Sequence, residues 1–419
     1  MERKRAKTRR RGSAYLVVLA VSMIVATLGL GALLATRAQA RAAALLGEEA
    51  EARYYALSAI ELGRLWIAQD PQWRTNRQNG VWASNQPIGS GTFTLEVTDP
   101  VDGNLANRPH DPVIVKATAM KGLARQVIQV TLTANPTPLP ALACALHTGG
   151  QLHLTAGSQL SAGQARLSTN GSLRNDGTIT GNVEAGSASS VGVINGTLTL
   201  GGPAKAFPDP SVINLYVNLG TEITAPSTID KQVFAPGYNS LGGPTNAEGV
   251  YVIRSATNLT IRNTRINGTL VILCPGKKVI VDNQVLLQPS RSDYPALIVQ
   301  GDLALQYNTV GTPLSEPGAN VNFNPPGAPY QGIGDTDLLD QYPSEIQGLV
   351  HVTGTLELNQ DALVRGAVIC ESTALADAVK CTNAKSIVYT PSLLSNPPQG
   401  YTTGVKMQPQ AGSWRQLVD

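Results

Sequence analysis

Aromatic and charged residues are both scarce in this chain of 419 residues. It contains 4 Phe, 4 Trp and 12 Tyr, and Asp, Glu, Lys and Arg together make up only 15% of it. So little charge argues against an intrinsically disordered chain. The 41 Gly residues argue against a helical bundle, because glycine weakens the interior of a helix. The composition favours many short strands and tight turns, packed by Val, Ile, Leu and Ala.

Cysteine is rare and has none of the spacings that hold a metal. The chain has Cys144, Cys274, Cys370 and Cys381, and no two of them form a C-x-x-C motif, so zinc and redox motifs are unsupported. Cys370 and Cys381 bracket a short loop, and they are the best pair for a disulfide if the chain is exported to an oxidising space. The alternative is that both are small buried residues.

Motifs for catalysis and cofactor binding are also missing from the sequence. There is no P-loop, dinucleotide fingerprint or nucleophile elbow. The histidines, His110, His147, His153 and His351, do not form a metal-binding set. We therefore expect a protein without a cofactor and without enzymatic activity.

The positive charge of the chain is confined to its first residues. Residues 1–11 form a basic leader with seven Lys or Arg and one Glu, a balance of +6, so the net charge of +3 leaves 3 − 6 = −3 for the rest. The body has no basic stripe, and we expect no nucleic-acid partner.

Residues 12–36 contain no charged residue and are predicted to form a transmembrane helix. The run Ala14–Thr36 has 23 residues, and a hydrocarbon core needs about 20 helical residues. The basic leader favours a cytoplasmic amino terminus and an exported body. A cleaved signal would have a shorter apolar run, although Ala38-Gln39-Ala40 mimics a cleavage site. A buried core helix is the other alternative.

Residues 37–70 are predicted to extend this helix beyond the membrane, because they are rich in helix-forming residues and contain no Pro. The alternative is an anchor followed by an ordinary spacer helix. We assign the apolar stripe of this outer half to Leu45, Leu46, Tyr54, Leu57, Ile60 and Leu65. Within the membrane segment, the residues expected to pack against other helices are Tyr15, Leu16, Leu19, Met23, Leu30 and Leu34.

Basic residues, then Gly12-Ser13-Ala14, then a long apolar helix, resemble the amino terminus of type IV pilin-like proteins. The resemblance is to PilX-type minor pilins and type II secretion minor pseudopilins, and Arg53–Gly63 resembles a stretch common after that helix. It implies that a prepilin peptidase cuts between Gly12 and Ser13 and that the new terminus is methylated. Major pilins carry a Glu at the fifth mature position, where this chain has Val17. Ordinary polymerisation into a filament is therefore doubtful.

Residues 71–135 read as a small β region, the pilin-like head, with expected strands at 92–97, 112–117 and 125–132. Residues 136–143 form a Pro-rich linker and a domain boundary. Residues 391–419 are expected to form a tail that runs extended over the domain of residues 144–390, with Trp414 as an anchor.

Residues 144–390 carry an irregular repeat that predicts a right-handed parallel β-helix, a solenoid. Six copies share an aliphatic residue, a central Gly two positions later and another aliphatic residue. The central glycines are Gly181, Gly196, Gly268, Gly301, Gly354 and Gly366, separated by 15, 72, 33, 53 and 12 positions. This part resembles β-helical domains behind PilX-like amino termini and, faintly, bactofilins. A β-sandwich is the alternative.

Two groups of carboxylates were considered for chemistry. Asp335, Asp337 and Asp340 have a spacing that suits Ca²⁺ ligands, but the Gly and the distal Glu of an EF-hand loop are missing, and a solvated loop is the preferred interpretation. Asp282, Asp302 and Asp361 are candidates for glycosidase carboxylates, for which sequence supplies no separation.

The pattern as a whole predicts a non-enzymatic, minor pilin-like or pseudopilin-like subunit of a type IV pilus or type II secretion type machine. It is expected in the bacterial inner membrane as a single-pass protein, with its amino terminus in the cytoplasm and its body in the periplasm or outside the cell. The resemblance implies the membrane, other pilin-like or secretion-machine subunits and a prepilin peptidase as partners. The alternatives are a tethered β-helix that binds or cleaves polysaccharide and a self-associating scaffold.

Overall fold

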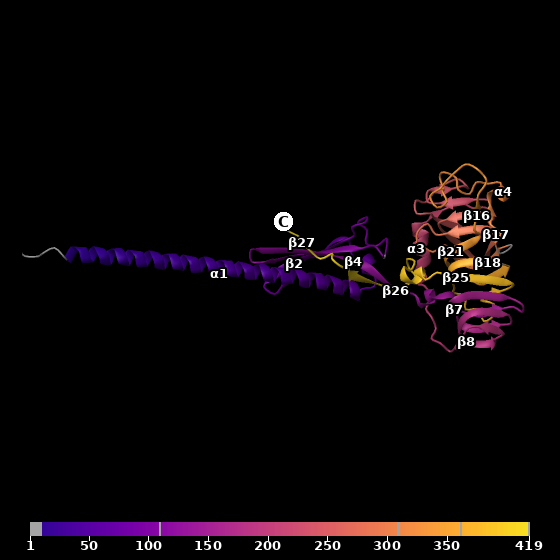
Figure 1. The fold of residues 1–419 in the computed structure, drawn as a ribbon, viewed down its shortest axis with the longest axis horizontal. Helices are drawn as coiled ribbons and strands as arrows, with labels where there is room; N and C mark the ends of the chain where they lie inside the picture. The colour runs from indigo at the N-terminus through magenta and orange to yellow at the C-terminus, as the bar shows by residue number, and fades with distance from the viewer. Residues whose placement is uncertain (1–10, 109, 308–310, 361–362, 418–419) are drawn as a thin grey trace, which may run out of the picture. The chain divides into compact units, whose positions relative to one another are not determined.

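The computed structural model describes residues 11–108, 110–307, 311–360 and 363–417, and the chain divides into two compact units. Unit 1 comprises residues up to Asn135 together with those from Lys406 onward. Unit 2 comprises Pro136–Val405. Figure 1 shows a long helix at the start of the chain and strands through most of the remainder. The expected long apolar helix followed by a mainly β chain is confirmed.

Helix α1 (Arg11–Gln69) is one unbroken helix of 59 residues. Within the described residues it is the one helix that is long and apolar enough to cross a membrane. Every side chain from Ala14 to Gly47 is exposed. The membrane segment and its extension are therefore parts of one rod, because neither Pro nor a capping residue interrupts the helix before Pro71.

The remainder of unit 1 is an antiparallel sheet. It follows the short helix α2 (Trp73–Asn76), and its strands are β1 (Gly80–Ile88), β2 (Gly91–Thr98), β3 (Val113–Lys121) and β4 (Ala124–Pro138), in that spatial order. Strands β2, β3 and β4 correspond to the three that were expected, and β1 was missed. Buried and half-buried residues alternate along β2, with Phe93, Leu95 and Val97 buried against α1.

The face of α1 that packs on this sheet is made of small residues, and the expected stripe was wrong. The buried positions are Ala52, Ala56, Ala59, Ile60, Gly63 and Ile67, at helical spacing. Of the expected stripe only Ile60 is fully buried, and Leu45, Leu46, Tyr54 and Leu65 are exposed. Small side chains are favoured at this contact because they let the helix backbone come close to the sheet. At Gly63, for example, a Cβ would lie 3.0 Å from Leu95 Cδ2.

Residues 391–419 do not form the expected extended tail over the domain of residues 144–390. Strands β26 (Thr402–Pro409) and β27 (Arg415–Leu417) join the sheet of unit 1, and β27 pairs antiparallel with β4. Trp414 is 41% exposed, so it does not act as a buried anchor. The correction has a simple cause: β4 would otherwise be an edge strand with unpaired backbone groups.

Residues 136–143 are also more ordered than a linker. Pro136–Pro138 complete β4, and a 3-10 helix, η1 (Pro140–Ala143), follows with Ala141 and Leu142 buried in unit 2. Leu139 N donates to Tyr401 O at 3.2 Å, which ties the entrance of unit 2 to its exit.

Unit 2 is built on a 19-stranded sheet in which every described pairing is parallel, apart from the hairpin of β13 and β14. Its strands are β5 (Cys144–Thr148), β6 (Leu152–Leu154), β7 (Gln159–Asn175), β8 (Thr178–Ser190), β9 (Val193–Asn195), β10 (Leu198–Leu200), β11 (Thr221–Glu222), β12 (Thr228–Asp230), β13 (Val233–Ala235), β14 (Tyr238–Asn239), β15 (Val250–Arg254), β16 (Leu259–Asn267), β17 (Thr269–Gln288), β18 (Leu297–Tyr307), β21 (Glu345–Val352), β22 (Leu356–Gln360), β23 (Leu363–Cys370), β24 (Val379–Cys381) and β25 (Ala384–Tyr389).

The parallel pairings arrange the strands in three stacks, and within each stack successive strands or parts of strands lie side by side in register. Stack A runs through β15, the first part of β17, the first part of β18, the ends of β21 and β23, and β5. Stack B runs through β12, β16, β17, the end of β18, β22, β24 and β6. Stack C runs through β13, the end of β16, the end of β17, the start of β21, the start of β23, and β25.

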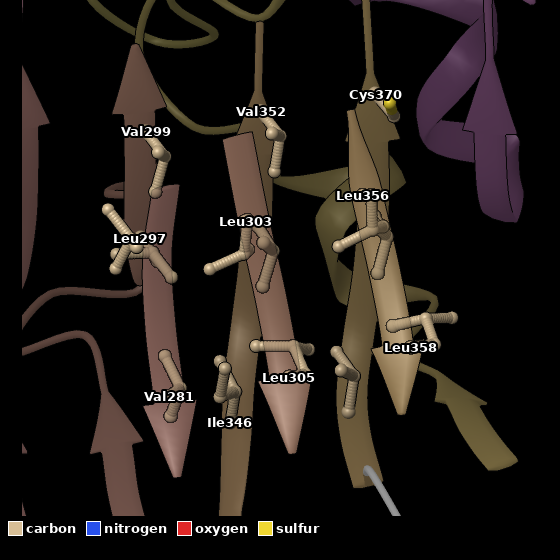
Figure 2. Close-up of a cluster of buried hydrophobic side chains, with 14 of the residues drawn as sticks. Val281, Leu297, Val299, Leu303, Leu305, Ile346, Val352, Leu356, Leu358 and Cys370 are labelled. Carbon is tan, nitrogen blue, oxygen red and sulfur yellow. The ribbon is translucent and has the colours of Figure 1, made fainter. Parts of the chain in front are cut away.

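Aliphatic side chains fill the space between the stacks. Figure 2 shows neighbouring strands carrying them in register, as Leu303 lies beside Leu356 and Leu305 beside Leu358. A second ladder, in stack A, runs from Val299 through Val352 to Cys370. These residues are almost wholly inaccessible to solvent, so repeated aliphatic burial holds the stacks together.

The chain enters this sheet in the middle, which explains the irregular repeat. One passage of the chain through the three stacks is here called a rung. Strands β5, β6 and β7 pair with β23, β24 and β25, which form the last rung along the chain. The chain then proceeds to β10 at one end, passes through α3 (Ser211–Leu219), and restarts at β11 at the other end. The gap of 72 residues between Gly196 and Gly268 spans this passage. The gap of 53 spans the loop that holds β19 (Leu314–Ser315), α4 (Glu316–Ala319) and β20 (Gln341–Tyr342).

The repeat glycines allow the backbones of successive rungs to approach closely. A Cβ at Gly366 would overlap the carbonyl oxygen of Gly348, and one at Gly268 would overlap that of Gly249. Gly354 instead lies against Gly301, at the corner between stacks A and B. The six copies therefore belong to two different corners, and this is why Gly354 and Gly366 are only 12 positions apart.

Two of the three stacks are covered on the outside. Helix α3 packs on stack A through Val212 and Tyr216, and α5 (Ser392–Ser395) adds Leu393. The loop after β18 packs on stack C, where buried Arg265 donates to the carbonyl oxygens of Phe323 and Ala328. Buried Glu316 accepts from Phe323 N at 2.6 Å and from the Tyr342 hydroxyl at 2.8 Å. A charged pair of this kind, each satisfied by hydrogen bonds, fixes the loop.

The close packing of α1 on its sheet is tested by Gly63→Leu. The added side chain meets Leu95, so we expect unit 1 to lose about 1–3 kcal/mol of stability through overpacking. All four Trp residues, at 66, 73, 82 and 414, lie in unit 1, so tryptophan fluorescence during denaturant unfolding reports on this unit. Gly47→Leu is the matched control, since its Cβ would meet nothing within 4 Å. Equal loss in both variants would contradict the packing.

The contact between rungs is tested by Gly366→Ala. A Cβ that overlaps the Gly348 carbonyl forces the rungs apart, and we expect a loss of at least about 2 kcal/mol in unit 2. Hydrogen exchange of peptides from β21 and β23 would measure this as faster exchange. Gly318→Ala, whose Cβ would be in ordinary contact at 3.4 Å, should leave exchange unchanged.

Candidate functional site

The apolar half of α1 is the strongest candidate site. The residues expected to pack against other helices are all exposed, by 58% to 82%: Tyr15, Leu16, Leu19, Met23, Leu30 and Leu34. An apolar surface of this size on a monomer marks contact with lipid or protein. Two polar groups of this surface are satisfied within the helix, because the hydroxyls of Thr27 and Thr36 donate to Ile24 O and Ala32 O.

The expected processing site lies at the start of α1. Gly12 and Ser13 are in the first helical turn, and residues 1–10 of the leader lie outside the described residues. Val17 is 62% exposed on the helix surface. It is uncharged, so the apolar half of α1 carries no carboxylate near its amino terminus.

The outer half of α1 also leaves apolar side chains exposed. Leu45, Leu46, Tyr54 and Leu65 are about half to two thirds exposed there. Leu46 and Tyr54 also line a shallow groove beside β4 and β27, together with Glu49, Ala50, Arg53, Leu57, Gln126 and Gln416. In that groove Gln126 donates to Glu49 at 3.1 Å. The same helix therefore presents apolar side chains along its whole length, although half of it is packed on a sheet.

The histidines of unit 2 are structural. His351 is fully buried, with Nδ1 2.9 Å from the Tyr401 hydroxyl and Nε2 2.9 Å from Glu371 Oε1. Burial holds the pKa of Tyr401 well above its ordinary value, so this hydroxyl stays neutral. His153 lies on stack B, 2.5 Å from Asp377 and 3.6 Å from Asp176.

His147 has a different environment. It is fully buried on stack A and its ring stacks on Phe207 with 5.0 Å between the centroids. Burial, reinforced by the nearby Lys205 ammonium, lowers the pKa of His147 to about 4. The ring is therefore neutral at pH 7 and behaves as part of the core.

The expected disulfide between Cys370 and Cys381 is wrong. All four cysteines are described, and all are free and buried. Cys370 ends a strand of stack A, beside Val352, whereas Cys381 ends a strand of stack B, beside Leu358. Burial raises the pKa of the Cys370 thiol to about 11 and that of Cys381 to about 12, so both remain protonated. They are core residues of different stacks.

Of the Ca²⁺ candidates Asp335, Asp337 and Asp340, the first and the last converge on the side-chain amide of Asn324, and Asp337 does not join them. Asp335 Oδ2 and Asp340 Oδ2 accept from the amide of Asn324, at 3.3 and 2.9 Å. Asp337 Oδ1 accepts from Leu339 N at 3.0 Å. These contacts shape the loop that covers stack C, and the three residues form no metal-binding group among the residues searched.

The glycosidase candidates do not form a pair of free carboxylates. Asp302 Oδ1 accepts from the backbone N–H and the hydroxyl of Thr355, at 2.7 and 2.9 Å, and so fixes a corner. Asp282 pairs in register with Arg262 on the outside of stack B, and Asp361 lies outside the described residues. Stack B carries further ion pairs, such as Lys278 with Glu357 at 2.8 Å.

No known protein family matches the chain, and no curated protein matches it. The solved structures that resemble it include the following two. The competence-associated pilin ComZ from Thermus thermophilus shares 11% identity with a TM-score of 0.25, covering 89% of this chain and 98% of that one. The DUF3494 domain of an ice-binding protein from Shewanella frigidimarina shares 12% identity with a TM-score of 0.23, covering 61% of this chain and 99% of that one. TM-scores this low do not establish a common fold.

The buried His147 makes the stability of unit 2 depend on pH. Its pKa of about 4 in the fold lies below the value of about 6.5 in the unfolded chain. Its contribution is therefore complete above pH 6.5 and is lost as the pH falls toward 4, by about 3 kcal/mol at most. Far-UV circular dichroism melts from pH 7 to pH 4 would measure this. His147→Phe keeps the stacked ring and should flatten the profile, and an unchanged slope would contradict the assignment.

Proposed function

We propose that this chain is a non-enzymatic, minor pilin-like subunit of a type IV pilus or type II secretion type machine. The observation that carries the proposal is the continuity of α1. One rigid helix presents an exposed apolar half at residues 14–36, and its other end packs as the spine of a small antiparallel head.

The exposed half needs an apolar environment, which lipid provides before assembly and neighbouring helices provide after it. Leu45, Leu46, Tyr54 and Leu65 extend the contact surface beyond the membrane. The partners we propose are the inner membrane, other pilin-like or secretion-machine subunits and a prepilin peptidase. We propose that the amino terminus lies in the cytoplasm and the body in the periplasm or outside the cell, and the basic leader supports this orientation.

Val17 supports a minor role for the subunit. An apolar residue at that position adds no charge that a neighbouring subunit would have to neutralise in an apolar environment. The subunit therefore primes, caps or decorates an assembly and does not repeat along it.

We also propose that unit 2 is the right-handed parallel β-helix that the repeat predicts, displayed outside the cytoplasm. Three stacks of in-register parallel strands and glycines at two corners support this assignment. An experimental density map of the full chain would decide the hand of the coil.

One observation favours this function over binding or cleavage of polysaccharide. Among the described side chains of unit 2, every aromatic is buried or half-buried, whereas Tyr15, Tyr54 and Trp414, which are exposed, lie in unit 1. A sugar-binding groove is expected to expose aromatic rings. Two carboxylates of stack B, those of Asp230 and Glu357, are also paired with the basic side chains of Arg262 and Lys278.

Mass spectrometry of the amino terminus tests the proposal on protein isolated from native membranes. We expect a chain that starts with methylated Ser13. Gly12→Val should block the cut and leave Met1, and Gly31→Val serves as a control, because Gly31 has nothing within 4 Å of a Cβ and lies away from the junction. A native chain that starts at Met1 would indicate a plain anchor. A start at Arg41 would indicate ordinary secretion, and either result contradicts the proposal.

A further inference from the structure

The loop between β2 and β3 of unit 1 gathers three carboxylates that sequence analysis did not single out. They belong to Asp99, Asp102 and Asp111, and one ligand oxygen from each lies within 4.8 Å of the other two. Asp99 follows directly on β2, and Asp111 lies two residues before β3. The pairing of the two strands therefore brings the ends of the loop together.

Arg74 of α2 fixes this loop without neutralising its carboxylates. Its guanidinium donates to the backbone carbonyl oxygens of Leu105, at 3.2 Å, and Asp111. Asp99 Oδ1 accepts from Val101 N at 2.7 Å, and Asp102 Oδ1 accepts from Asn104 N at 2.9 Å. The loop is thus held in shape by bonds that occupy one oxygen of Asp99 and, because the Asn107 amide donates to Asp102 Oδ2, both oxygens of Asp102.

Several oxygens in the loop are buried and have no hydrogen-bond partner. Asp99 is only 5% exposed, and its Oδ2 is one of these atoms. Asp111 Oδ2 is a second, and Asn107 Oδ1, from a side chain that donates to Asp102, is a third. Leaving a buried charged acceptor unsatisfied costs at least about 1–3 kcal/mol per group, so the fold holds oxygens that a cation would satisfy.

The charge around the loop points the same way. Three carboxylates face the positive charges of Arg74 and Arg108, which leaves an excess of one negative charge. A bound cation would neutralise this excess.

We propose that Asp99, Asp102 and Asp111 bind Ca²⁺ in the head of unit 1. Oxygens on opposite sides of a Ca²⁺ ion lie about 4.8 Å apart, twice a bond of about 2.4 Å, so three oxygens that all lie within 4.8 Å of one another can reach one ion. Ca²⁺ accepts irregular sets of oxygen ligands, whereas Mg²⁺ demands near-ideal octahedral geometry and retains several waters, so the loop suits Ca²⁺ better. The ion joins the two ends of the loop and stabilises the β2–β3 pair.

Binding is tested on the full chain in detergent, first treated with a chelator. Because every Trp lies in unit 1, tryptophan fluorescence follows the melting of the head alone. We expect Ca²⁺ at about 1 mM, a concentration at which extracellular modules bind it, to raise the melting temperature of unit 1. The same concentration of Mg²⁺ should not raise it.

Asp102→Asn is the decisive variant, because Asp102 is exposed and its replacement leaves the buried core intact. We expect its Ca²⁺ affinity, from titration calorimetry, to fall at least tenfold. Asp111→Asn should also lose the Ca²⁺ response and melt higher than the wild type without Ca²⁺, since it removes repulsion. Asp335→Asn in unit 2 is the matched control and should retain wild-type affinity.

The proposal is overturned if the wild type shows no Ca²⁺-dependent shift, if Mg²⁺ gives the same shift, or if Asp102→Asn binds as tightly as the wild type. These outcomes are independent of the amino-terminal processing, so failure here leaves the pilin-like function standing, and the converse also holds.

Discussion

Close approach of backbones is the constraint on which both units depend. In unit 1, Ala52, Ala56, Ala59 and Gly63 bring α1 down onto the sheet, and the larger apolar side chains remain outside. In unit 2, Gly366 lies against the carbonyl of Gly348. Dispersion and apolar burial are short-ranged, so small residues at the contact allow neighbouring aliphatic side chains to interdigitate. The scarcity of aromatic residues follows, because such narrow spaces accept Val, Ile and Leu more easily than rings.

The packing of α1 by small residues has a consequence for function. The sheet is contacted mainly through Ala, Gly and Ile residues of α1, and the apolar residues Leu45, Leu46, Tyr54 and Leu65 remain exposed on the same helix. They continue the exposed surface of residues 14–36 along the same rod. An unbroken helix that is both an exposed apolar rod and the spine of a head is rigid along its length, as the proposed role of the chain as a subunit requires.

Buried ionisable side chains have different surroundings in the two units. In unit 2, buried Arg265 and Glu316 are satisfied by backbone groups of the loop over stack C, and His147 is kept neutral by burial. In the β2–β3 loop of unit 1, Asp99 and Asp111 keep buried oxygens without partners. Among the described residues, Asp99 and Asp111 are the carboxylates with buried oxygens that lack a hydrogen-bond partner. Because a fold normally satisfies its buried polar atoms, the loop is a place for a ligand.

The sequence by itself determined the long apolar helix, the strands of the head and the mainly β character of unit 2, because these depend on local hydrophobic length and periodicity. It could not determine which side of α1 is buried, since Leu46 and Ala52 both suit a helix and only the sheet selects between them. The disulfide expected between Cys370 and Cys381 failed for the same reason: proximity along the chain does not reveal that they belong to different stacks. The repeat glycines were found, but the entry of the chain in the middle of the sheet was not. The tertiary structure alone decided that order, the return of residues 402–409 to the head and the convergence of Asp99, Asp102 and Asp111, because each arises from pairing between segments that are distant or looped in the sequence.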